Sequence, residues 1–170
     1  MYTVFNVIEK SFRFIRIILI LTYYKMKYGK RLQLGRGIHF RKGFTVNISK
    51  EGKVKIGNGC FFNNYCSINC HKEITIGDKN IFGENVKIYD HNHVFNREDV
   101  DMRYSFNSRA IAIGDNNWIG SDSVILSHAR IGSNNVIGAG IVIDQEITSD
   151  NLVRRTNDKE ITKIERTRQS

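Results

Sequence analysis

The chain has 170 residues, with 26 Lys and Arg against 17 Asp and Glu, and a formal net charge of +9. This length suits one domain with a sizeable core rather than two domains and a linker. The positive charge favours acidic partners such as phosphates, anionic glycans or an anionic membrane surface. Nucleic acid is not expected as a partner, because the sequence carries no helix-turn-helix, zinc-finger or aromatic ribonucleoprotein pattern.

Residues 1–31 form a basic and apolar segment that the sequence predicts to be helical. Its unbroken apolar stretch, residues 17–21, is far shorter than the roughly 20 residues that a spanning helix needs. Two interpretations stay open at this point. The segment is either an interfacial amphipathic helix on an anionic membrane leaflet or a helix packed against its own or a neighbouring subunit.

Aliphatic and aromatic residues recur every six positions along most of the chain. A helical pattern with this step would drift off one face within two repeats, whereas a short strand followed by a tight turn keeps every sixth side chain inside a three-sided coil. The in-register positions are Leu34, Phe40, Val46, Ile56, Phe62, Ile68, Ile76, Phe82, Ile88, Ile113, Ile119, Ile125, Ile131, Ile137 and Ile143. The sequence therefore predicts an all-β solenoid over residues 32–147, a left-handed parallel β-helix of about five coils with short terminal helices. Residues 148–170 are predicted to form a charged tail.

Small and polar residues lie between the apolar positions. Gly, Asn and Asp are expected to build the corners because they tolerate the positive φ of tight turns. These corner residues are Gly57, Gly77, Asp78, Asn80, Gly83, Asp115, Asn116 and Asn134. The three cysteines, Cys60, Cys66 and Cys70, are interpreted as small wall residues of a protein in a reducing, cytoplasmic setting, since no signal peptide accompanies them and their number is odd.

The repeat is interrupted once, between Ile88 and Ile113. These residues are 25 positions apart where the repeat needs six, so residues 89–112 are predicted to leave the solenoid as a loop. Loops on a rigid scaffold are common places for functional sites. This loop begins with Tyr89, Asp90, His91, Asn92 and His93, and an imidazole held by a neighbouring carboxylate or carbonyl can act as a base near neutral pH.

The runs IGDKNIFGENVKIYDHNHVF and IAIGDNNWIGSDSVILSHARIGSNNVIGAGIVI resemble the hexapeptide-repeat acetyltransferases. The resemblance extends over roughly residues 32–147 and is greatest to the galactoside and maltose acetyltransferases and the polysaccharide O-acetyltransferases. It implies O-acetyl transfer from acetyl-CoA, as cosubstrate, to a sugar hydroxyl in a homotrimer. The basic amino terminus favours a capsule or O-antigen unit, or its precursor, at the inner face of the membrane.

The resemblance also assigns roles to matching positions. The family's loop histidine acts as general base and corresponds to His93, with His91 as the reserve candidate. The expected acceptor-binding residues are Asn63, Tyr89, Asp90 and Trp118. The expected cofactor-binding residues are Trp118, Gly120, Ser121, Gly138 and Ala139, whose backbone would hydrogen-bond the pantetheine arm while nearby amides stabilise the oxyanion.

The sequence departs from the family in two places. Ser127, His128 and Ala129 replace a Pro-Gly step, so this turn is expected to be built differently. Residues 156–161 (TNDKEI) replace the Gly-x-Pro-Ala tail that contacts the nucleotide, so contacts with the adenosine end of CoA are not assigned. Asn157 and Glu160 are instead suited to cap a short helix.

Two alternatives to acetyl transfer are kept. Asp90, His91 and His93 could ligate zinc as in the β-helix carbonic anhydrases, but His71 and His128 are at unsuitable spacings for a third histidine ligand, so no metal is expected. The other alternative is a solenoid that binds partners without catalysis. His39 and His71 are expected to be corner or surface residues outside the mechanism.

Overall fold

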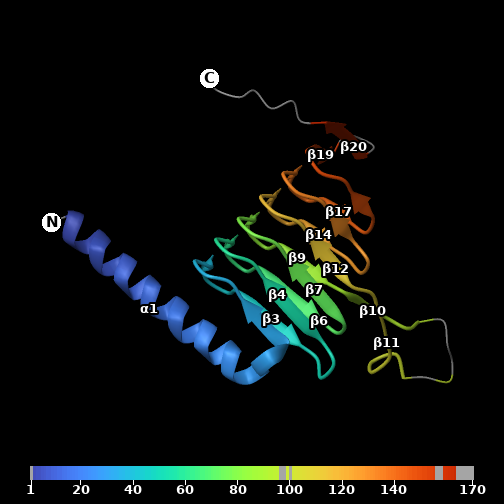
Figure 1. Cartoon of the computed structure of the whole chain (residues 1–170), viewed down its shortest axis with the longest axis horizontal. Helices are drawn as coiled ribbons and strands as arrows, with labels where there is room; N and C mark the ends of the chain where they lie inside the picture. Colours follow the sequence, from blue (N-terminus) through green and yellow to red (C-terminus); the bar gives the residue numbers. More distant parts are fainter. Residues whose placement is uncertain (1, 96–98, 100, 156–158, 164–170) are drawn as a thin grey trace.

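In the computed structural model, which describes residues 2–95, 99, 101–155 and 159–163, a long helix is followed by a stack of three-sided coils (Figure 1). The predicted parallel β-helix is confirmed, with about six coils rather than five because the strand pairing continues beyond residue 147. Each coil adds one short strand to each of three parallel sheets, which we call face 1, face 2 and face 3 in chain order.

The strands of each face run from the first coil to the last. Face 1 contains β1 (Leu32–Leu34), β4 (Lys53–Ile56), β7 (Glu73–Ile76), β12 (Ile111–Ile113), β15 (Arg130–Ile131) and β18 (Glu146–Ile147). Face 2 contains β2 (His39–Phe40), β5 (Phe61–Phe62), β8 (Ile81–Phe82), β13 (Trp118–Ile119), β16 (Val136–Ile137), β19 (Asn151–Arg155) and β20 (Lys159–Lys163). Face 3 contains β3 (Thr45–Ile48), β6 (Ser67–Cys70), β9 (Lys87–Tyr89), β14 (Val124–Ile125) and β17 (Val142–Ile143).

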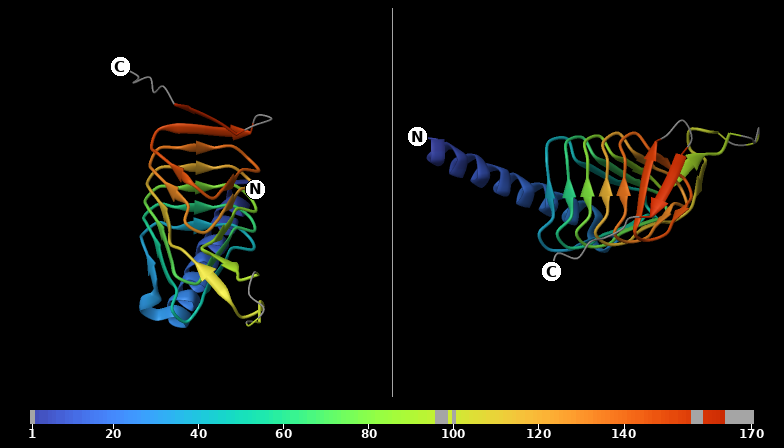
Figure 2. Two further views of the ribbon diagram at one scale, coloured as in Figure 1. Left: turned by 90° about the vertical axis from the view of Figure 1, so that its right-hand side faces the viewer. Right: turned by 90° about the horizontal axis from the view of Figure 1, so that it is seen from above.

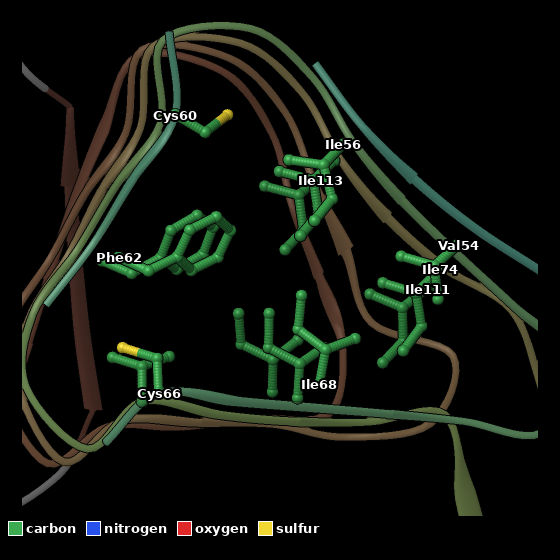
Figure 3. Close-up of a cluster of buried hydrophobic side chains, with 14 of the residues drawn as sticks. Val54, Ile56, Cys60, Phe62, Cys66, Ile68, Ile74, Ile111 and Ile113 are labelled. Atoms are coloured by element: carbon green, nitrogen blue, oxygen red, sulfur yellow. The ribbon is translucent and has the colours of Figure 1, made fainter. Parts of the chain in front are cut away.

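The six-residue repeat fills the inside of the coils with matched columns of side chains. Figure 3 shows Val54, Ile74 and Ile111 one above another inside the stack, and all three are at most 1% exposed. Phe62 stacks on Phe82 with ring centroids 4.5 Å apart. Because identical positions of successive coils pair in register, the predicted apolar positions form one continuous core, against which the partly buried Leu34 packs.

The corners depend on glycine for a different reason than the sequence indicated. Gly57, Gly77 and Gly83 do not have positive φ, whereas Asn116 and Asn134 do. A Cβ on Gly57 would lie 2.5 Å from the carbonyl carbon of Gly77, and one on Gly83 would lie 2.5 Å from the backbone nitrogen of Ser121. These glycines are therefore needed because successive coils approach closely at the corners.

The helix α1 (Tyr2–Tyr28) and the 3-10 turn η1 (Gly29–Arg31) precede the coils. The carboxyl-terminal part of α1 covers the open end of the first coil, where Ile17, Tyr24 and Tyr28 are buried. The Tyr28 hydroxyl donates to the Val46 carbonyl at 2.9 Å, and the Val46 N–H donates to the Tyr24 hydroxyl at 3.2 Å. Part of this helix thus packs against its own chain. Among the described residues, no helix is long and apolar enough to cross a membrane.

The expected carboxyl-terminal helix is wrong in its described part. Residues 159–163 form the strand β20, which pairs antiparallel with β19 along the last edge of face 2. The exposed edge of β19 offers backbone groups that a following strand can satisfy, and this pairing overrides the local capping pattern. Asn157 lies outside the described residues.

Replacement of Phe62 tests the stacked core. Phe62→Ala should lower the free energy of unfolding by about 3–5 kcal/mol, because it removes a ring that packs on both Phe44 and Phe82. Urea denaturation followed by circular dichroism would measure the change. Phe95→Ala is the matched control, since Phe95 is an exposed phenylalanine, and an equal loss in the two variants would contradict the assignment of Phe62 to the core.

Candidate active site

The insertion predicted at residues 89–112 forms a hairpin at the corner between face 3 and face 1. The strands β10 (His91–His93) and β11 (Phe106–Ser108) pair antiparallel, with His93 opposite Phe106 and His91 opposite Ser108. Figures 1 and 2 show this hairpin extending away from the coil stack. The coils on its two sides stay in register, because β12 pairs directly with β7. The two candidate histidines are therefore carried on an arm of a fixed scaffold.

Asp90 anchors the start of this arm. Its side chain is fully buried, and its carboxylate accepts backbone N–H groups of His71, Lys72 and Glu73 at 2.7–2.9 Å. It also lies 3.1 Å from Nδ1 of His91. A carboxylate that is buried and bonded to the preceding corner is suited to position the histidine, and a direct contact between Asp90 and the acceptor stays a prediction.

His91 belongs to a cluster of three rings that contact one another. Its ring centroid lies 3.9 Å from that of His71 and 5.3 Å from that of Phe106. His71 in turn lies 4.2 Å from Phe106, and burial together with the nearby His91 lowers the pKa of His71, which favours its neutral form. The sequence interpretation missed His71 and Phe106. His71 precedes the insertion by a whole coil and Phe106 closes it, so only the folded chain brings them together.

His93 has the hydrogen bond expected of a general base. Its Nδ1 lies 2.7 Å from the backbone carbonyl oxygen of Met102, and its side chain is exposed. A carbonyl oxygen can only accept, so Nδ1 must carry the proton and the neutral ring presents an unprotonated Nε2. This is the arrangement in which an imidazole can remove a proton from a hydroxyl.

A polar cavity of about 380 Å³ lies on face 3 beside the rings of His71 and His91, whereas His93 is not among its lining residues. Its lining includes His71, His91 and Tyr89, together with Asn47 and Asn69, which are hydrogen-bonded to each other at 3.0 Å. Lys27 and Tyr28 from the end of α1 complete it on one side. Amide, hydroxyl and aromatic groups around a cavity of this size suit a sugar, and Tyr89 is the predicted acceptor residue that lines it.

The other predicted residues lie on a different corner. Asn63, Gly120 and Gly138 occupy equivalent positions of their coils, immediately after β5, β13 and β16, where face 2 turns into face 3. Trp118 is 56% exposed on the outer side of face 2. Within one chain, the structure therefore brings Asn63 together with the predicted cofactor residues but not with His91 or His93.

The backbone at this corner is only partly available to a ligand. The N–H groups of Gly120 and Gly138 donate to Ile137 and Val153 of the next coil at 2.7 Å, so these two donors are already used within the stack. No acceptor is found for the N–H of Ser121 or Ala139 in the described part of the chain. Ser121 and Ala139 therefore fit the expected bonds to a pantetheine arm, while the glycines permit the coils to stack.

The cysteines are structural. All three are free and buried, and burial raises the pKa of Cys66 to about 11 and also raises those of Cys60 and Cys70. A thiol that stays protonated is a poor nucleophile and a poor metal ligand. Within the residues that the structure describes, no group of three or more His, Cys, Asp or Glu side chains could hold a metal ion.

Comparison with known proteins agrees with this architecture. The family model of the bacterial transferase hexapeptide (six repeats) matches residues 111–145. The galactoside O-acetyltransferase of Escherichia coli (strain K12) is 32% identical over 126 residues, which cover 68% of this chain and 60% of that protein. WbbJ of the same strain, named as a lipopolysaccharide biosynthesis O-acetyl transferase, is 28% identical over 131 residues, covering 68% of this chain and 66% of that protein.

A solved structure extends the likeness to most of the chain. The hexapeptide-repeat acetyltransferase VCA0836 from Vibrio cholerae O1 biovar eltor, complexed with acetyl coenzyme A, superposes with a TM-score of 0.69 at 25% identity, covering 79% of this chain and 72% of that chain. The chain therefore carries the hexapeptide repeat of bacterial transferases in residues 111–145 and shares the fold of this acetyltransferase. It spans less than two thirds of the length of the two E. coli relatives.

Replacement of Asp90 tests the anchor of the arm. Asp90→Asn should lower the free energy of unfolding by about 1–3 kcal/mol, because the new amide turns N–H donors toward the N–H groups of residues 71–73. Thermal or urea unfolding would measure this loss. Asp122→Asn, at an exposed corner, makes the same chemical change and should have little effect. Equal stability of the Asp90 variant and the wild type would contradict the anchoring role.

Proposed function

We propose that this protein is an O-acetyltransferase that moves the acetyl group of acetyl-CoA to a hydroxyl of a sugar. The observation that carries the proposal is the bond from His93 Nδ1 to the Met102 carbonyl, which leaves Nε2 as a base on an exposed arm. Support also comes from the similarity to galactoside O-acetyltransferase and from the Vibrio cholerae structure that contains acetyl-CoA.

The chemistry needs no covalent enzyme intermediate. His93 Nε2 takes the proton of the acceptor hydroxyl as its oxygen attacks the thioester carbonyl of acetyl-CoA. The tetrahedral oxyanion then collapses, the carbon–sulfur bond breaks, and the imidazolium returns its proton to the departing CoA thiolate. Backbone N–H groups at the cofactor corner, such as those of Ser121 and Ala139, would bind the cosubstrate and favour the oxyanion.

The acceptor is proposed to be a unit or precursor of a cell-surface polysaccharide. The polar cavity supplies amides and a tyrosine for sugar hydroxyls, and Lys27 at its edge favours an acceptor with negative charge. The relative WbbJ is named for lipopolysaccharide biosynthesis, which is consistent with this class of acceptor. The proposed setting is the cytoplasmic side of the membrane.

We further propose that the site is completed in a homotrimer. The base and the cofactor corner lie on different edges of one chain, so a neighbouring subunit would supply one of them. Face 2 offers an apolar surface for such a contact, because Phe61, Ile81, Trp118 and Val136 follow one another on its outer side. A cyclic arrangement would repeat the same contact three times.

Replacement of the base gives the direct test. His93→Ala should lower kcat by about 10²–10⁴-fold while leaving acetyl-CoA affinity nearly unchanged, because the base acts on the acceptor hydroxyl. Thiol release with maltose, a galactoside and purified capsular or O-antigen polysaccharides would measure turnover, and calorimetry would measure acetyl-CoA binding. His128→Asn is the matched control, since His128 is an exposed corner histidine whose positive φ suits asparagine.

Each contrary outcome identifies what fails. A His93 variant with wild-type turnover would remove His93 as the base, and a larger loss in His91→Ala would transfer the role to His91. Absence of acetyl-CoA binding by the wild type would overturn the transferase proposal. Metal analysis of that sample would then separate a zinc protein of the carbonic anhydrase type from a non-catalytic solenoid.

Light scattering tests the trimer. The wild type should have three times the chain mass, and Ile81→Arg should reduce it, because a guanidinium would be buried in an apolar contact without a partner. Thr75→Arg is the control, since Thr75 lies on face 1 between Lys55 and Ala112. A monomeric wild type would contradict the shared site.

A further inference from the structure

One side of α1 is apolar and uncovered. Phe12, Ile15, Leu19, Tyr23 and Met26 are spaced three or four residues apart, so they share one face of the helix, and their exposed fractions are 53–81%. We call these five residues the outer stripe. The residues that pack on the solenoid, such as Ile17 and Tyr24, lie on the opposite side. Figure 2 shows that the amino-terminal part of α1 continues past the first coil, where no other element covers it.

The same segment is strongly basic. Residues 10–31 contain no Asp or Glu, and the cations among them are Lys10, Arg13, Arg16, Lys25, Lys27, Lys30 and Arg31. The side chains of Arg16 and Lys25 are exposed on the same helix. Apolar side chains with flanking cations and no acid are the composition that binds the interface of an anionic bilayer.

We propose that α1 docks the protein on an anionic lipid bilayer through the outer stripe and its flanking cations. Charge favours lipid over a second copy of this chain as the occupant. Two copies paired through the stripe would bring like-charged segments side by side, whereas anionic headgroups neutralise them. The apolar stripe lies in the plane of the interface, and the helix does not cross the membrane.

Docking would hold the candidate acceptor cavity at the membrane surface. Lys27 and Tyr28 belong to the last turn of the docked helix and also line the cavity beside His71 and His91. An acceptor whose lipid anchor stays in the bilayer would therefore meet the cavity close to the membrane surface. This consequence rests on the proposed sugar acetyltransferase function, whereas docking itself does not.

Vesicle sedimentation tests the docking. The purified full chain should sediment with vesicles of equal parts phosphatidylcholine and phosphatidylglycerol, but not with phosphatidylcholine alone, and added salt should weaken the binding. Phe12→Ser/Leu19→Ser and Arg16→Glu/Lys25→Glu should each lower the bound fraction by about tenfold or more. Lys50→Glu/Lys55→Glu is the charge-matched control outside α1 and should bind as the wild type does.

A fluorescent label tests which face enters the lipid. The native cysteines are all buried, so Met26→Cys provides one accessible thiol on the outer stripe. An environment-sensitive dye there should shift to the blue with anionic vesicles, whereas the same dye on Lys50→Cys should not. A blue shift at position 26 supports insertion of the stripe, and an unchanged spectrum overturns it.

The remaining outcomes separate the alternatives. A wild type that stays in the supernatant with anionic vesicles overturns the docking. If Phe12→Ser/Leu19→Ser lowers the oligomer mass and leaves vesicle binding unchanged, the stripe binds a second copy and the docking is wrong. Vesicle binding uses neither acetyl-CoA nor acceptor, so loss of docking with intact acetyl-CoA binding would leave the proposed transferase standing, and the reverse result would remove the transferase alone.

Discussion

The parallel register between successive coils is the constraint on which the rest of the structure depends. Gly35 donates to Ile56, Gly57 to Ile76, Gly77 to Ile113 and Gly114 to Ile131, all at 2.7–2.9 Å. Each donor stands on the same corner of its coil, so a shift of one residue would move the apolar column out of the core. A column of asparagines supports the same register. The backbone N–H of Asn117 donates to the side-chain oxygen of Asn80, that of Asn135 to Asn117, and that of Asn151 to Asn135.

This register explains how an insertion can carry a site without disturbing the scaffold. The insertion leaves after β9 and returns at β12, and Ile76 still pairs with Ile113 as though nothing separated them. Asp90 fixes the point where the insertion leaves the stack, because its carboxylate accepts hydrogen bonds from three backbone N–H groups at the corner of the previous coil. The same carboxylate contacts His91, which couples the geometry of the arm to the stack.

The sequence predicted the coils well because a six-residue period is a local property that survives folding. It could not reveal contacts made between coils and across the insertion. His71 was assigned to a corner or the surface, and its contact with the ring of His91 was not predicted, because one coil brings residues about twenty positions apart into contact. The glycines were assigned to turns because they tolerate positive φ. Gly57 and Gly77 are instead required because a Cβ at either position would clash with the backbone of the next coil. The hairpin of β19 and β20 likewise depends on an open sheet edge, which no local pattern records.

The proposed base and the candidate cofactor residues lie on two different edges of the solenoid, and this separation limits how one chain could catalyse the reaction. Face 3 separates the corner of Gly83 and Gly120 from the corner of Asp90, and the three-residue strand β9 alone covers roughly 10 Å at about 3.3 Å per residue. Proton transfer requires contact at about 3 Å between the base and the hydroxyl. The hairpin extends away from its own stack instead of folding back over face 3 (Figure 2). An arm of this form can serve a cofactor held on an adjacent subunit, and the exposed Trp118 would then face a neighbour's histidine.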